Sequence, residues 1–353
     1  MGVRHYLVGL ILIFSITAQA QEKKSGKAKA LTVGFYNMEN LFDIYDDPAT
    51  RDSEYTPEGK NNWTKERYQR KLTNMATVIS KIGADELGSR HGAPSILGIC
   101  EAENLKVIED LVSQPELKSK NYGIVHQDSP DRRGIDVALL YKKKDFVVEN
   151  ARWAPLKIKS DEGEEFFTRE QLVVSGKLEN GEELHVIVNH WPSRYGGEKR
   201  SRPKRNAAAD LTRSLVDSIS AVKPGAKIVV MGDLNDDPDN ASVKKHLRTK
   251  GDRKKLQEGD LYNPYETYFK KGIGTLAYRD NWNLFDQLIL TQPLIDKNSG
   301  GYYLMKAKIF NKKFLKQQEG RYKGYPWRTF AGGRYSGGYG DHFPVYMILV
   351  REL

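Results

Sequence analysis

Residues 228–235 read Ile-Val-Val-Met-Gly-Asp-Leu-Asn, an apolar run that ends in a glycine and two polar residues. A strand that is apolar at every position is expected when both of its faces are buried. The carboxylate of Asp233 and the amide of Asn235 therefore stand at the end of a buried strand. The same residues also suit a turn, because Asp237-Pro238 follows them, and both interpretations can hold together.

Similar runs recur on both sides of this stretch, and helical stretches separate them. The absence of a Pro/Gly/Ser linker or a visible repeat favours one α+β domain, with sheets in the middle and helices outside. The apolar spacing predicts helices over 64–82, 104–112 and 206–219, the last one following a break at Pro203. Strands are predicted over 31–38, 95–100, 137–141, 172–178, 184–189, 227–231, 285–290, 302–310 and 345–350.

The first twenty residues have the pattern of a secretory signal peptide. Arg4 and His5 precede an apolar run over 6–18, and Ala18-Gln19-Ala20 is a small-x-small cleavage site. An uncleaved anchor is the alternative, but the run is shorter than the roughly 20 residues that a spanning helix needs. We therefore expect a signal peptide over 1–20, a flexible lead-in over 21–30 and one folded domain over 31–353. The protein is then exported, to the periplasm or the medium.

Composition narrows the chemistry further. The 353 residues include 56 Lys and Arg against 46 Asp and Glu, a net charge of +10, and one cysteine, Cys100. A single cysteine excludes an intrachain disulfide and a four-cysteine zinc site. The positive charge favours polyanionic partners, either nucleic acid or an acidic membrane surface, although it also serves plain solubility.

Polar side chains stand at the ends of most of the predicted strands. Strand ends share an edge, so these groups can converge in one cleft. Oxygen ligands suit a hard divalent ion such as Mg²⁺, and a histidine beside a carboxylate suits proton transfer, as His342 with Asp286 would. The residues concerned are Asn37, Glu39, Glu101, His190, Asp233, Asn235, Asp286, Asp341 and His342.

Six short motifs, in order, resemble those of the endonuclease/exonuclease/phosphatase superfamily, and of its secreted deoxyribonuclease branch in particular. The resemblance implies a four-layered α/β/β/α sandwich, in which helices flank two mixed β-sheets and the metal and substrate bind at one edge. It covers about residues 31–350. The motifs are Asn37-Met38-Glu39, Gly98-Ile99-Cys100-Glu101, Asn189-His190-Trp191, Gly232-Asp233-Leu234-Asn235, Phe285-Asp286-Gln287-Leu288-Ile289 and Asp341-His342-Phe343-Pro344.

The resemblance also implies roles for individual residues. Glu101, Asn37 and Asp341, with Glu39 as a further candidate, would hold Mg²⁺, for which Mn²⁺ or Ca²⁺ could substitute. Asp233 and Asn235 would orient the attacking water, and His342 with Asp286 behind it would act as base or stabilise the phosphate. His190 would protonate the leaving oxygen, with Asp136 as a candidate orienter. Arg169 and Arg133 would contact phosphate. Cys100 departs from the family, which usually has glutamine there, and we interpret it as an inert core thiol.

Two basic regions are candidates for substrate contact. Residues 199–205 hold five basic side chains, which could equally be a solvated helix start. Residues 298–340 hold nine Lys or Arg, one acid and ten aromatic residues. Interleaved cations and rings suit phosphate contact and base stacking. We expect Trp327, Arg328 and Tyr335 to contact substrate from a loop that glycines 332–333 and 337–338 make mobile.

The sequence therefore predicts an exported, divalent-metal-dependent phosphodiesterase, an endonuclease acting on DNA, with RNA as a second candidate substrate. One alternative keeps the fold but changes the substrate to a phospholipid or to a sugar or inositol phosphate. A second alternative is a basic nucleic-acid-binding module without activity. No protein partner and no stable membrane insertion are implied.

Overall fold

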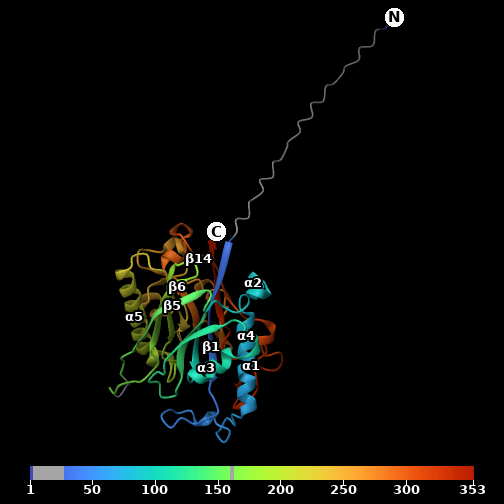
Figure 1. Cartoon of the computed structure of the whole chain (residues 1–353), viewed down its shortest axis with the longest axis vertical. Coiled ribbons are helices and arrows are strands. Elements are labelled where there is room, and N and C mark those ends of the chain that lie inside the picture. The colour runs from blue at the N-terminus through green and yellow to red at the C-terminus, as the bar shows by residue number, and fades with distance from the viewer. Residues whose placement is uncertain (3–27, 160–162) are drawn as a thin grey trace.

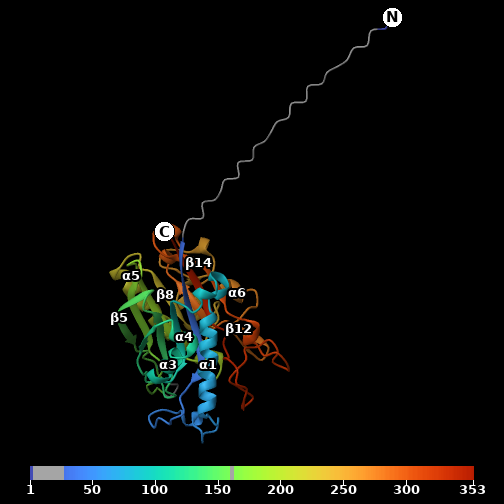
Figure 2. The ribbon, with the colours of Figure 1, turned by 45° about the vertical axis from the view of Figure 1, so that its right-hand side comes forward.

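Two large β-sheets pack face to face in the computed structural model, which describes residues 1–2, 28–159 and 163–353. Helices cover the outer faces of the sheets, with α5 on one side and α1, α3 and α4 on the other (Figures 1 and 2). The expected signal peptide over 1–20 lies outside the described residues, apart from its first two positions. The observed fold confirms the expected four-layered α+β sandwich.

The first sheet has six strands and carries the N-terminal and C-terminal strands of the domain side by side. The parallel pairing of β1 with β2 puts the carboxyl ends of both strands at the same edge. The remaining pairs are antiparallel, so the sheet is mixed. In spatial order the strands are β14 (Tyr303–Ile309), β17 (Val345–Glu352), β1 (Ala28–Leu41), β2 (Ile96–Ala102), β4 (Asp136–Lys142) and β3 (Tyr122–His126).

The second sheet has seven strands and is also mixed. One of its two parallel pairs, β7 with β8, again directs two carboxyl ends to one edge, and the other is β9 with β10. In spatial order the strands are β5 (Phe146–Ala154), β6 (Gln171–Leu178), β7 (Glu183–His190), β8 (Ile228–Asp233), β13 (Asp286–Leu290), β10 (Leu261–Tyr262) and β9 (Thr249–Lys250). Two small hairpins stand apart, β11 (Leu276–Tyr278) with β12 (Asn281–Asn283) and β15 (Phe330–Ala331) with β16 (Arg334–Tyr335).

The three long helices, α1, α3 and α5, each bury an apolar stripe. The side chain of Thr64 caps α1 by accepting a hydrogen bond from the amide of Arg67. Among the described residues no helix is both long and apolar enough to cross a bilayer. The helices are α1 (Lys65–Lys81), α2 (Ala84–Leu87), α3 (Leu105–Val112), α4 (Pro115–Lys118), α5 (Glu198–Val222) and α6 (Glu266–Phe269).

The core lies mainly between the two sheets. Gly98 of β2 faces Met231 of β8, and a β-carbon at Gly98 would come within 2.4 Å of the Met231 sulfur. A glycine is therefore needed where the sheets approach most closely. This close packing fixes one sheet on the other and aligns their polar edges.

Three details differ from the sequence-based expectations. The domain begins at Ala28 rather than Leu31, because residues 28–30 already pair with β17, so the lead-in is shorter than expected. Strands β3 and β5 were not predicted. Helix α5 starts at Glu198 and runs through Pro203, where a break was expected. The proline removes only one helical hydrogen bond, and the guanidinium of Arg205 holds the first turn by donating to the carbonyl of Glu198 (3.2 Å).

Candidate active site

The polar strand ends of the two sheets meet at one edge, as the sequence led us to expect. The ends of β1 and β2 bring Asn37 and Glu101 to this edge from the first sheet. The register of the second sheet pairs Asp233 with His190 on one side and with Asp286 on the other. Backbone pairing alone therefore assembles three of the candidate residues in a row.

Asp233 is the centre of this cluster. Its carboxylate is 2% exposed and accepts hydrogen bonds from the amide nitrogen of the Asn37 side chain (3.1 Å) and from the backbone N–H of Asn235 (2.9 Å). Burial raises the pKa of Asp233 to about 7, with His342 lowering it and the Asp286 carboxylate raising it. A carboxylate with a pKa near neutrality is suited to accept a proton at physiological pH.

Glu101 lies on the other side of Asn37 in a strained backbone conformation. Its φ of 60° falls in the left-handed region, which is unusual for glutamate, and Asn235 has a φ of 49°. The Glu101 carboxylate accepts a hydrogen bond from the backbone N–H of Asn40 (3.0 Å), and its other oxygen is 3.7 Å from Nε2 of His190. Strain of this kind gathers at functional sites, where it aims side chains.

His342 and Asp286 form the pair that the sequence suggested. Nδ1 of His342 is 2.7 Å from Oδ2 of Asp286, and the hydroxyl of Thr275 donates to the same oxygen. Burial alone would lower the pKa of His342, but the carboxylates of Asp286 and Asp341 raise it well above its ordinary value. The imidazole is therefore cationic at neutral pH.

His190 is neutral, in contrast to the cationic His342. Its Nε2 lies 3.8 Å from Oδ2 of Asp233, and its Nδ1 is buried without a hydrogen bond to any described residue. Burial, followed by the nearby charges of Arg169, Arg133 and His342, lowers its pKa well below the ordinary value. The site thus holds one neutral and one cationic histidine. Two titratable groups whose pKa values are moved apart by their surroundings are typical of acid–base pairs.

The structure places Arg169 and Arg133 beside His190 and shows a residue that the sequence analysis missed. Asp131 binds the guanidinium of Arg169 (2.8 Å) and lies 3.5 Å from Nε of Arg133, so it joins the two cations. Although burial raises the pKa of Asp131, these guanidiniums lower it overall. The sequence feature that could have indicated Asp131 is its position in a turn two residues before Arg133. Nothing in the sequence identifies Arg169 as the ion-pair partner of Asp131.

Asp136 does not orient His190. Its carboxylate lies 3.0 Å from Nε2 of His126 and accepts a hydrogen bond from the backbone N–H of Ser129 (2.8 Å). The expectation was wrong because Asp136 lies on β4 two residues from Ala138, which pairs with His126 at the end of β3, so the two side chains are close neighbours. His126 is accordingly a partner of a buried acid.

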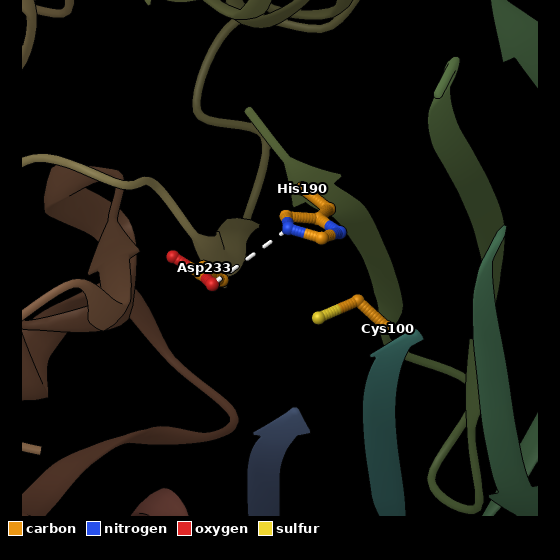
Figure 3. Close-up of side chains that lie close together, drawn as sticks. All are labelled: Cys100, His190 and Asp233. Atoms are coloured by element: carbon orange, nitrogen blue, oxygen red, sulfur yellow. Dashed lines mark ion pairs between the residues drawn. The ribbon is translucent and has the colours of Figure 1, made fainter. Parts of the chain in front are cut away.

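Cys100 lies within the cluster rather than apart from it. Figure 3 shows its sulfur pointing toward His190 and Asp233, and the potential ligand atoms of the three residues lie within 4.8 Å of one another. Burial raises the pKa of the thiol well above its ordinary value, and the Asp233 and Glu101 charges act in the same direction. The thiol is therefore neutral and packs under the site.

Glu39 and Asp341 occupy the rim of the cluster. Oε2 of Glu39 accepts hydrogen bonds from the backbone N–H of Thr329 (2.7 Å) and from its hydroxyl (2.6 Å), and Lys71 lies 3.3 Å away. Only Oε1 of Glu39 remains for a metal. Oδ1 of Asp341 is buried without a hydrogen bond to any described residue, although Nε2 of His342 is 4.0 Å away.

The expected substrate loop is anchored to this rim by Thr329. Trp327 packs edge-on against Tyr339 with 5.8 Å between ring centroids, and Tyr335 lies under the guanidinium of Arg67 (4.4 Å). Arg328 is half-buried and has no ionic partner among the described residues. Glycines 332–333 and 337–338, which were expected to make the loop mobile, take part in specific contacts. The side chain of Asn74 donates hydrogen bonds to the carbonyls of Gly337 and Gly338, and Gly332 and Gly333 form the turn between β15 and β16.

The donor chemistry of the edge fits a hard divalent cation. Glu101 and Asn37 offer a carboxylate and an amide oxygen side by side, and the buried Oδ1 of Asp341 and Oδ1 of Asp286 lack hydrogen-bond donors. Asp233, Asp286 and His342 also present ligand atoms within 4.8 Å of one another. Burying a carboxylate oxygen without a hydrogen-bond donor costs free energy unless a cation or a substrate group binds to it.

A family comparison agrees with this geometry. The model of the endonuclease/exonuclease/phosphatase family matches residues 32–351. The chain belongs to this family. Its members are hydrolases that act on phosphoester bonds and depend on a divalent metal. A search of curated proteins found no match.

Solved structures share the fold at low sequence identity. Truncated TDP2 from Caenorhabditis elegans is 17% identical with a TM-score of 0.54, over 91% of this chain and 97% of that one. Danio rerio TDP2 complexed with a single-strand DNA product is 13% identical, with a TM-score of 0.52 over 91% and 98%. A mannosyl-6-phosphatase from Bacteroides thetaiotaomicron is 15% identical, with a TM-score of 0.53 over 90% and 99%. These likenesses show the fold.

The charge on His342 gives the first test. Asp286→Asn removes the nearest carboxylate, so the pKa of His342 should fall, and the alkaline limb of the kcat/KM profile should move to lower pH by about 1 to 3 pH units. The sign follows because the cationic imidazole is then lost at lower pH. The matched control is Asp210→Asn, which removes the carboxylate 2.8 Å from the remote His246. An alkaline limb that is unchanged in Asp286→Asn would contradict the pairing.

Proposed function

We propose that this protein is an exported, metal-dependent phosphodiesterase that cuts nucleic acid internally, DNA and also RNA, by in-line attack of water on phosphorus. The observation that carries the proposal is the position of the buried Asp233 carboxylate, whose pKa is about 7. It lies between the neutral His190 and the cationic His342, which is paired with Asp286. A base, a proton carrier and a positive charge beside one another are what phosphodiester hydrolysis requires.

Each polar residue of the cluster would have its own role in the reaction. Asp233, with Asn235 beside it, would orient the attacking water and accept its proton as the oxygen bonds to phosphorus. The cationic His342 would stabilise the added charge on the phosphoryl oxygens while the bond to the leaving oxygen breaks. His190 is neutral at rest, so the proton that it delivers to the leaving oxygen has to be gained during the reaction, and the Asp233 carboxyl is 3.8 Å away.

Glu101, Asn37 and Asp341 would hold the divalent cation, with Oε1 of Glu39 as a further candidate. When bound there, Mg²⁺ would neutralise charge on the phosphate. The strained φ of Glu101 and the unsatisfied oxygen of Asp341 support this assignment. Mn²⁺ or Ca²⁺ could take the same oxygen ligands.

A nucleic-acid substrate is supported by charge and by the loop at the rim. The net charge of +10 favours a polyanion, and we assign Arg169, Arg133, Arg328, Trp327 and Tyr335 as the cations and rings that would contact it. Danio rerio TDP2, which shares the fold, was solved with a single-strand DNA product. Export is supported by the pattern of residues 1–20 alone.

Arg328→Ala tests the substrate-contacting role of the loop. If the guanidinium contacts phosphate, its loss should raise KM for an oligonucleotide about tenfold while kcat stays nearly constant. Hydrolysis of a small phosphodiester, which does not reach the loop, should be unaffected. The control is Arg152→Ala, at an exposed position on β5. An unchanged KM for the oligonucleotide would remove Arg328 from the substrate contacts.

The substrate class is tested by offering the purified enzyme supercoiled DNA, RNA, sphingomyelin and mannose 6-phosphate in parallel with Mg²⁺. We expect nicking of DNA and cleavage of RNA. Exclusive turnover of mannose 6-phosphate would instead favour the sugar phosphatase alternative, to which the fold of the Bacteroides thetaiotaomicron mannosyl-6-phosphatase gives some support. Exclusive turnover of sphingomyelin would favour a lipid substrate.

A further inference from the structure

A second basic surface lies apart from the catalytic edge, around α6, β10 and the edge strand β9. It is a hollow of ≈ 640 Å³, which we call the α6 groove. Six cations and two acids are among its lining residues, so its walls are strongly positive. The cations are Lys244, Lys250, Arg253, Lys254, Lys255 and Lys270, and the acids are Asp252 and Glu266.

Most of this charge is not neutralised by the protein. Glu266 pairs with Lys244 (2.8 Å) and with Lys270 (2.6 Å). Asp252 accepts a hydrogen bond from the backbone N–H of Lys254 (3.0 Å) and so serves the local turn. The four other cations have no carboxylate within ion-pair distance among the described residues. They are available to an anionic ligand.

The basic run over 199–205, which the sequence marked as a candidate, is a useful contrast. There the guanidinium of Arg205 is fully buried 2.7 Å from Asp236, and Arg202 pairs with Glu198 (2.8 Å). These two arginines therefore support α5 and its surroundings. The α6 groove differs because four of its six cations have no carboxylate partner among the described residues.

Aromatic rings accompany the cations of the groove. The guanidinium of Arg253 stands 5.0 Å from the centroid of the Tyr262 ring. A smaller hollow of ≈ 360 Å³ shares Arg253 and Tyr262 and adds Tyr268 and Lys271. Cations for phosphates next to rings for bases are the combination that binds single-stranded nucleic acid without sequence preference.

The groove lies at the far end of the second sheet. Tyr262 pairs with Leu290, whereas Asp286 at the other end of β13 pairs with Asp233. Four residues of strand separate these two levels by about 13 Å. In Figure 2, α6 lies toward the end of the molecule that carries the C-terminus. A ligand in the groove is therefore remote from the reacting phosphate.

We propose that the α6 groove binds the phosphate backbone of a nucleic-acid strand whose scissile phosphate lies at Asp233. This inference rests on the proposed function and adds that the substrate is a strand long enough to reach both places. An acidic membrane is the weaker candidate, because no large exposed apolar side chain lines the groove among the described residues.

The test is the binding of labelled single-stranded oligonucleotides by fluorescence anisotropy, in EDTA so that the DNA stays intact. Lys254→Glu/Lys255→Glu should weaken binding of a strand of about 30 nucleotides about tenfold and reduce the salt dependence of binding. Lys143→Glu/Lys144→Glu is the matched control, because it reverses two adjacent exposed lysines in the β4–β5 turn.

The outcomes separate this inference from the proposed function. Equal affinities of the two double variants for the long strand would overturn the groove as a binding site, even if the enzyme cleaves DNA. Loss of binding in Lys254→Glu/Lys255→Glu alone supports the groove, even if no cleavage is found with Mg²⁺. Binding of vesicles of phosphatidylserine and phosphatidylcholine, without binding of the long strand, would overturn it in favour of a membrane.

Discussion

Replacing His342 with alanine is expected to lower kcat by about 10²- to 10³-fold, the range that one group stabilising transition-state charge contributes. The loss removes the cation beside the phosphate and leaves the Asp286 carboxylate buried without its partner. KM should change much less, because the interaction strengthens as charge develops on phosphorus. The measurement is steady-state hydrolysis of a small phosphodiester with Mg²⁺.

The control for this variant is His246→Ala, which removes another carboxylate-paired histidine from the surface. His342 is 7% exposed, so circular dichroism has to show that the variant folds. Should His342→Ala unfold, His342→Gln keeps most of the volume and serves the same test. Near-normal kcat in a folded variant would contradict the role of His342.

Removal of the metal is expected to have the second large effect. EDTA should abolish hydrolysis by the wild type, and added Mg²⁺ should restore it. Glu101→Gln weakens the carboxylate that we assign to the cation, so the Mg²⁺ concentration for half-maximal activity should rise by about 10- to 100-fold. The strained backbone of Glu101 makes this carboxylate hard to replace from a neighbouring position.

Glu109→Gln on α3 is the matched control, since it makes the same change at an exposed glutamate. It should leave the dependence on Mg²⁺ unchanged. If Glu101→Gln behaves like Glu109→Gln, Glu101 does not hold the cation. Activity that persists in EDTA would remove the metal from the account altogether.

The sequence predicted the buried strands well and the edge strands poorly, for a physical reason. Central strands such as β8 are apolar throughout because both faces are covered. Strand β5 lies at the edge of its sheet and reads Phe-Val-Val-Glu-Asn-Ala-Arg-Trp-Ala, with buried residues only at its two ends. Strands β3 and β9 are the other missed edge strands, whereas the edge strand β14 was predicted. An edge strand buries too little to leave a clear apolar pattern.

The sequence predicted the site residues that lie at strand ends. It did not predict which residues far apart in the sequence form ion pairs with one another. Asp233 and Asp286 follow from their places on strands, and the register joins them. The partner of Arg169 depends on how a loop folds over the edge, and the partner of Asp136 depends on how β3 pairs with β4, neither of which the sequence reveals. The sequence singled out the basic regions 199–205 and 298–340 and did not single out the α6 groove, because the ion-pair partners of surface cations cannot be read from the sequence.

The central claim is that one folded cluster around Asp233 hydrolyses phosphodiesters with the help of a divalent cation. The most direct measurement is the release of nitrophenolate from bis(4-nitrophenyl) phosphate by the wild type and by Asp233→Asn, each with Mg²⁺ and with EDTA. The account predicts release only by the wild type with Mg²⁺. Equal release by folded Asp233→Asn, or no release by the wild type under any condition, would contradict it.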